Sequence, residues 1–93
     1  MCRNIRVLYN FQPPTTPEEI RAAALQYVRK VSGIAKVSQG DHDAFERAVD
    51  EVAATTARLL GTLTARAPLR TREGEQARAK ERWRIRAERM RRA

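Results

Sequence analysis

Apolar and polar positions alternate near the start of the chain, which is the pattern of an extended segment. Every second residue of this stretch is apolar: Ile5, Val7, Tyr9 and Phe11. Since a lone strand has no evident partner, we expect these side chains to lie across the helices as an apolar cover. Pro13 and Pro14 should then turn the chain away.

A helix is predicted to begin directly after Thr16. Thr16 can cap it, Pro17 suits its first turn, and Glu19 can bond back to the N–H of the cap. Ser32-Gly33 should end the helix, because glycine readily adopts the left-handed conformation found just past helix ends. The apolar residues between these limits recur at spacings of four and three and share one face: Ile20, Ala24, Tyr27 or Val28, and Val31.

A second, longer helix is predicted after a loop over residues 34–42. It should begin near Asp41 or Asp43, where acidic side chains favour the positive end of the helix dipole. The next breakers are Gly61 and Pro68. Its apolar stripe comprises Phe45, Val49, Val52, Thr56, Leu59 and Leu63, widened by Ala48, Ala53 and Leu60.

These patterns predict an all-α fold: an antiparallel helical hairpin with the extended N-terminal segment packed on it and a basic, helical C-terminal tail. A chain of 93 residues has room for one hydrophobic core. We therefore divide it into a helical core domain with its N-terminal segment over residues 1–67, and an arginine-rich tail, helical or partly disordered, over residues 68–93. Two helices bury little surface, so homo-oligomerisation is an alternative way to cover the stripe.

The tail carries nearly all of the net charge of +8. Residues 1–65 contribute +1 and residues 66–93 contribute +7. Apart from Gly74, the tail is rich in strong helix formers, and Glu-Arg pairs add about 0.2 to 0.5 kcal/mol each. On a helix, one stripe would hold Ala79, Trp83, Ala87 and Met90, beside Arg78, Arg82, Arg86 and Arg89.

This basic stretch favours an anionic partner, because guanidinium groups bind phosphates and displace counterions. The predicted function is a non-enzymatic binding module that contacts RNA or DNA phosphates, with Trp83 available to stack on a base. A solvated, soluble helix is the simpler alternative, and a protein partner on an apolar stripe is another. The candidate nucleic-acid contacts are Arg70, Arg72, Arg78, Lys80, Arg82, Trp83, Arg84, Arg86, Arg89, Arg91 and Arg92.

Other chemistry has weaker support in the sequence. Cys2 is the only cysteine and His42 the only histidine, so thiol or metal chemistry at Cys2 is a minor alternative, and helix capping explains Asp41 and Asp43 more simply than metal binding. There is no phosphate-binding loop or catalytic motif, so we expect no enzyme activity, metal or cofactor. With no secretion signal and no apolar stretch of about 20 residues, we expect a cytoplasmic protein without a membrane partner.

Several strings resemble a family of short bacterial proteins, domain of unknown function 2277. They are Met1-Cys2-Arg3-Asn4-Ile5, Asn10-Phe11 before Pro13-Pro14, Glu18 to Lys30, and Phe45 with Arg47 to Ala53. The resemblance covers about residues 1–70. It implies a bacterial, cytoplasmic origin and no particular activity.

Overall fold

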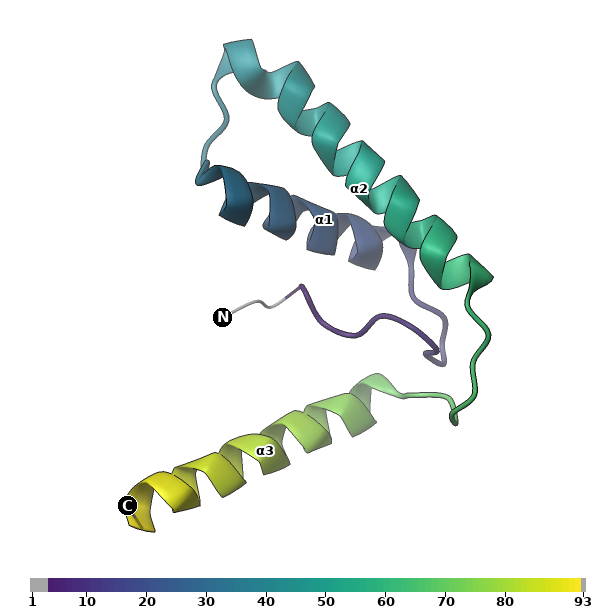
Figure 1. The fold of residues 1–93 in the computed structure, drawn as a ribbon, viewed down its shortest axis with the longest axis vertical. Coiled ribbons are helices and arrows are strands. Elements are labelled where there is room, and N and C mark those ends of the chain that lie inside the picture. The colour runs from purple at the N-terminus through teal and green to yellow at the C-terminus, as the bar shows by residue number, and fades with distance from the viewer. Residues whose placement is uncertain (1–3, 93) are drawn as a thin grey trace.

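The computed structural model describes residues 4–92 and contains three α-helices (Figure 1). Helix α1 spans Pro17–Ser32, α2 spans His42–Thr62 and α3 spans Arg72–Arg92, with a 3₁₀ turn at Gln39–Asp41 before α2. No strand forms within residues 4–92, where the only β-type pairing is an isolated bridge between Phe11 and Arg70. The all-α prediction is confirmed.

The ends of α1 are set by local signals, as the sequence predicts. The Glu19 N–H donates to Thr16 Oγ1 at 3.2 Å, and the Thr16 N–H donates to Glu19 Oε1 at 2.9 Å, which completes the capping box. At the other end Gly33 has φ +71°, and its N–H donates to the Arg29 carbonyl at 2.9 Å. The predicted start and stop of α1 are both confirmed.

Helices α1 and α2 pack as the predicted hairpin. Their core is Ala24, Val28, Phe45 and Val49, and Val49 is 0% exposed. Of the two candidates in α1, Val28 is therefore the core residue and Tyr27 is not. Outside the core, the Arg21 guanidinium pairs with Glu46 at 2.6 Å and with Asp50.

The predicted stripes are too long at both ends. Val31 in α1 is exposed, and so are Leu59 in α2 and Leu63 just beyond it. For Leu59 and Leu63 the physical reason is geometric: α2 has 21 residues and α1 has 16, so the last turns of α2 extend past the helix that would cover them. Val31 lies in the last turn of α1, next to the loop. The buried residues lie in the second half of α1 and the first half of α2, and the C-terminal end of α2 presents leucines to solvent.

The N-terminal segment covers the helices as predicted, but the residues that it buries are not all the predicted ones. Leu8 and Phe11 are buried, whereas Ile5 and Val7 are exposed. Strict alternation fails because the segment is not a strand and bends at Asn10, which has φ +65°. The segment lies between α1 and α3 in Figure 1, tied to α1 by the Asn4 and Ile5 N–H groups, which donate to Gln26 Oε1 at 2.8 and 3.1 Å.

Helix α3 is joined to the rest of the molecule at its start, by Arg72 and by Arg70 just before it. The Arg70 N–H donates to the Asn10 carbonyl at 2.7 Å, and the Gln12 N–H donates to the Arg70 carbonyl at 2.9 Å. Among the described residues, the backbone of α3 stays apart from α1 and α2, and the Arg72 side chain reaches Glu19 of α1. Most of α3 is therefore an exposed arm that extends away from the hairpin (Figure 1).

Gly33 supplies a test of the α1 end. We expect Gly33→Ala to destabilise the protein by about 1 kcal/mol, because a Cβ strains the left-handed conformation although no atom lies within 4 Å of its position. Gly61 also has open space around a Cβ but lies within α2, so Gly61→Ala should stabilise by up to about 1 kcal/mol. Urea denaturation of both variants checks the two signs, and equal effects would contradict this account.

Candidate nucleic-acid interface

One face of α3 carries four arginines in a row, the basic ridge: Arg78, Arg82, Arg86 and Arg89. At about 100° per residue these positions fall within a narrow sector, and they span about 16 Å of helix. Within residues 4–92, Arg82, Arg86 and Arg89 form no ion pair, and Arg78 makes a 3.8 Å contact with Glu75. The ridge is thus a row of positive charges that is little neutralised by its own helix.

On the opposite side of α3, Arg84 is paired within the helix. Arg84 donates to Glu81 at 2.6 Å and approaches Glu88 at 3.3 Å. The hydrogen bond from Arg84 lowers the pKa of the Glu81 carboxyl, and the same bond raises the pKa of Arg84. Of the other predicted contacts on α3, Lys80 and Arg91 lie on the same side as Arg84, and Arg92 follows Arg89 by one turn.

Trp83 lies beside the ridge and is 53% exposed. The guanidinium carbon of Arg86 sits 5.1 Å from the centre of its ring, which is a cation–π distance. Of the predicted stripe, Ala79 is half-buried, and Trp83, Ala87 and Met90 are exposed. An aromatic face and a row of arginines are adjacent on one exposed helix.

Arg70 and Arg72 have a different role from the other predicted contacts. Arg70 donates to the Tyr9 carbonyl at 2.7 Å and lies 3.5 Å from Glu75. Arg72 donates to Glu19 at 2.8 and 3.3 Å and to the Pro13 carbonyl at 2.9 Å. These two residues with their partners form the α3 anchor, which fastens the arm to the core.

The anchor continues into α1 through Glu19. The hydrogen bond from Arg72, followed by that from the Thr16 N–H, lowers the pKa of Glu19 from 4.5 to about 2. Arg6 also approaches this carboxylate, at 3.5 Å, and Arg72 lies 5.3 Å from the centre of the Phe11 ring. The sequence identifies Glu19 as a capping residue, but no local pattern reveals its second partner 53 residues away.

A hollow of about 400 Å³ separates the N-terminal segment from the first half of α3. We call it the α3 hollow. Its walls include Ile5, Val7, Phe11 and Ala79, and Arg82 of the basic ridge lies at its edge. Arg6, Arg72, Glu75 and Gln76 complete the lining, so the hollow combines apolar side chains with charged and polar ones next to the basic ridge.

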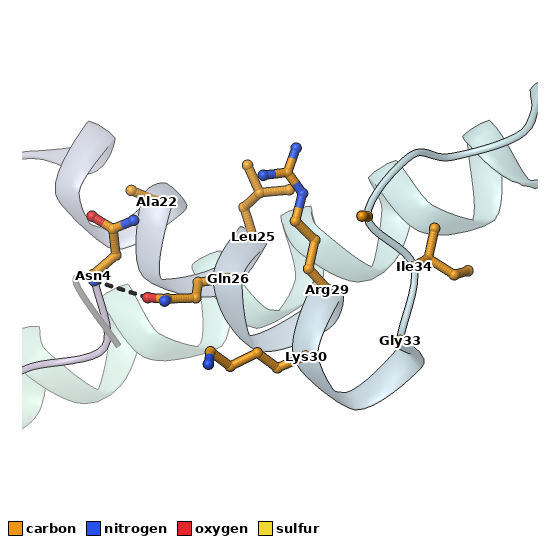
Figure 2. Close-up of a pocket in the computed structure, with 9 residues that line it drawn as sticks. Asn4, Ala22, Leu25, Gln26, Arg29, Lys30, Gly33 and Ile34 are labelled. Atoms are coloured by element: carbon orange, nitrogen blue, oxygen red, sulfur yellow. Dashed lines mark hydrogen bonds between the residues drawn. The ribbon is translucent and has the colours of Figure 1, made fainter. Parts of the chain in front are cut away.

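A second hollow, of about 530 Å³, lies between Asn4, α1 and the loop that follows α1 (Figure 2). The side-chain oxygen of Gln26, which lines this hollow, already accepts a hydrogen bond from the Asn4 N–H. Arg29 and Lys30 border it but point in different directions in Figure 2, so they do not converge on a common anion. We therefore place the candidate interface on α3.

Two further predictions concern metals and membranes. The thiol or metal chemistry predicted for Cys2 lies outside the described residues. Within residues 4–92 no group of three or more His, Cys, Asp or Glu side chains is placed to hold a metal ion, and His42 lies 3.5 Å from Asp43. Likewise, none of the described helices combines the length and apolar character that crossing a membrane requires.

A family model described as "Uncharacterized conserved protein (DUF2277)" matches residues 1–78. The match takes in the N-terminal segment, the hairpin, the anchor and the first turns of α3. Arg82, Arg86 and Arg89 lie beyond it. No curated protein and no solved structure matches the chain.

Proposed function

The chain belongs to the DUF2277 family of uncharacterized conserved proteins, a membership that assigns no activity, and we propose that it is a non-enzymatic module that binds nucleic acid through α3. The observation that carries the proposal is the basic ridge beside an exposed Trp83. The ridge offers unneutralised guanidinium groups, which are well suited to phosphate oxygens. The proposal includes a cytoplasmic location.

The anchor supports this proposal by fixing one end of the arm. The side chains of Arg70 and Arg72 already donate hydrogen bonds to the N-terminal segment and to α1. The nucleic-acid contacts that we propose are therefore the ridge and Trp83 rather than all eleven predicted residues. Lys80, Arg84, Arg91 and Arg92 add positive potential elsewhere on α3. A helix held at its base and exposed along its length can approach a polyanion without rearranging the hairpin.

The test replaces three ridge arginines, Arg82, Arg86 and Arg89, by glutamine. We expect binding of a fluorescently labelled oligonucleotide to weaken about tenfold, since each exposed contact contributes roughly 0.5 kcal/mol. The slope of log affinity against log salt should fall by about 2 for a single strand, because three phosphate contacts are lost. Fluorescence anisotropy across a salt series measures both quantities.

A matched control separates contact from overall charge. The triple variant Arg47→Gln, Arg58→Gln and Arg66→Gln removes the same three charges from outside α3, and we expect a smaller loss. A chain ending at Ala77 is a second control, because it retains the anchor and lacks the ridge. Equal losses in the two triple variants, or undiminished binding by the shortened chain, would rule out the ridge as the contact.

A protein-interaction or homo-oligomerisation module is the second candidate. Leu59, Leu63 and Leu69 are 54%, 48% and 59% exposed around the end of α2 and the linker that follows. Apolar association of this kind resists salt, whereas phosphate contacts weaken steeply as salt rises. The same salt series therefore separates the two candidates.

A further inference from the structure

The α3 hollow and Trp83 lie on the same side of α3, next to the basic ridge. Ala79 lines the hollow, and Trp83 follows one turn later, about 6 Å further along the helix. Arg82 belongs both to the edge of the hollow and to the ridge. A strand whose phosphates lie along the ridge would therefore have its bases beside apolar side chains and an aromatic ring.

The wall of the hollow is open and mixed: four apolar side chains line it together with Arg6, Arg72 and Gln76. Ile5 and Val7 remain 43% and 50% exposed, although they face α3 across the hollow with Phe11 and Ala79. Glu75 is the one carboxylate that residues 4–92 contribute to the lining, and Arg70 and Arg78 both contact it, so its charge is offset. The volume of about 400 Å³ falls in the range of pockets that hold small molecules, about 300 to 1,000 Å³.

We propose that this site takes single-stranded nucleic acid, with one unpaired base in the α3 hollow and a neighbouring base stacked on Trp83. The reason is that the flat face of a base is accessible only when the base is unpaired and unstacked; a duplex presents base edges and phosphates. Arg86 lies over one face of the Trp83 ring, so we place the stacked base on the other face, with the Arg86 guanidinium close to the phosphates of the same strand. This inference rests on the proposed function and adds the class of nucleic acid.

The test compares three labelled probes: a single-stranded RNA, a single-stranded DNA of the same sequence and the corresponding duplex DNA. We expect both single strands to bind more tightly than the duplex, and Trp83→Ala to weaken them at least about fivefold. Trp83→Phe should restore part of the loss, since it retains an aromatic face. Trp83 is the only tryptophan, so quenching of its fluorescence by the unlabelled strand reports the contact directly.

The hollow itself is tested with a matched pair of substitutions. Ala79→Leu adds bulk to its wall, whereas Ala77→Leu adds the same side chain to another face of α3. Leucine is a good helix former, and circular dichroism verifies that both variants are equally helical. We expect Ala79→Leu alone to weaken single-strand binding at least about fivefold.

Each outcome has a distinct meaning. Equal or tighter duplex binding, or equal affinities for the two leucine variants, overturns the single-strand site while leaving the ridge proposal intact if the ridge variant still loses affinity. Failure of the unmodified protein to bind any of the three probes overturns both proposals. A difference between the RNA and DNA arms identifies which single strand the site prefers.

Discussion

Replacing Phe45 by alanine is expected to lower the free energy of unfolding by about 3 to 5 kcal/mol, the usual cost of truncating a buried phenylalanine. Phe45 is 8% exposed and is the only aromatic residue in a core otherwise formed by Ala24, Val28 and Val49. A chain of 93 residues is expected to have a stability of roughly 5 kcal/mol or somewhat more. The substitution therefore removes most of it, and urea denaturation followed by circular dichroism should show a transition shifted close to zero urea.

Tyr27→Ala is the appropriate control for this prediction. It also truncates an aromatic side chain in the hairpin, but Tyr27 is half exposed, so the expected loss is about 1 kcal/mol or less. A loss below about 1 kcal/mol for Phe45→Ala would mean that the hairpin core is not the main source of stability. The protein would then depend on the anchor and the N-terminal segment instead.

The parts of the fold that depend on neighbouring residues follow from the sequence. Thr16 and Glu19 specify the start of α1 through bonds three residues apart, and Gly33 specifies its end through its own backbone conformation. The parts that depend on distant residues do not follow. The periodicity of Leu59 and Leu63 is that of buried residues, but whether a partner covers them depends on how far α1 extends along α2.

The N-terminal segment and the anchor illustrate the same limit. Alternation predicts Val7 as a covering residue, but the bend at Asn10 buries Leu8 instead. Arg70 and Arg72 have the same residue type as the ridge arginines, so composition cannot separate them. Only the tertiary structure shows that the side chains of these two donate to the Tyr9 carbonyl and to Glu19 while the ridge remains exposed.

Removing the charge of Glu19 is expected to loosen α3 at neutral pH. Glu19→Gln retains an acceptor for the capping box, because glutamine serves there as well as glutamate, but it loses the ion pair with Arg72. We expect the Arg70 N–H, which bonds to the Asn10 carbonyl, to exchange with solvent at least about tenfold faster, corresponding to a charged hydrogen bond of roughly 1.5 kcal/mol. The Val49 amide in α2 should change much less, which localises the effect to the anchor.

The same ion pair predicts a pH dependence with a definite sign. Because the pKa of Glu19 falls from 4.5 to about 2 in the folded protein, its contribution is fully present above pH 4.5 and is lost as the pH falls towards 2. The difference between Glu19→Gln and the unmodified protein should therefore be constant near neutral pH and shrink across this window. Exchange rates of the Arg70 amide measured at several pH values test this.

Glu18→Gln distinguishes the anchor from a general effect of charge at the start of α1. Glu18 lies beside Glu19 in the same first turn but is exposed. Glu18→Gln therefore removes the same charge as Glu19→Gln from the same end of the helix dipole, but it leaves Arg72 paired with Glu19. Arg72→Gln should reproduce the effect of Glu19→Gln, and the double variant should lose less than the sum of the two because both remove one interaction. Additive losses, or an equal effect of Glu18→Gln, would show that the arm is held by the backbone bonds between Asn10 and Arg70 rather than by the ion pair.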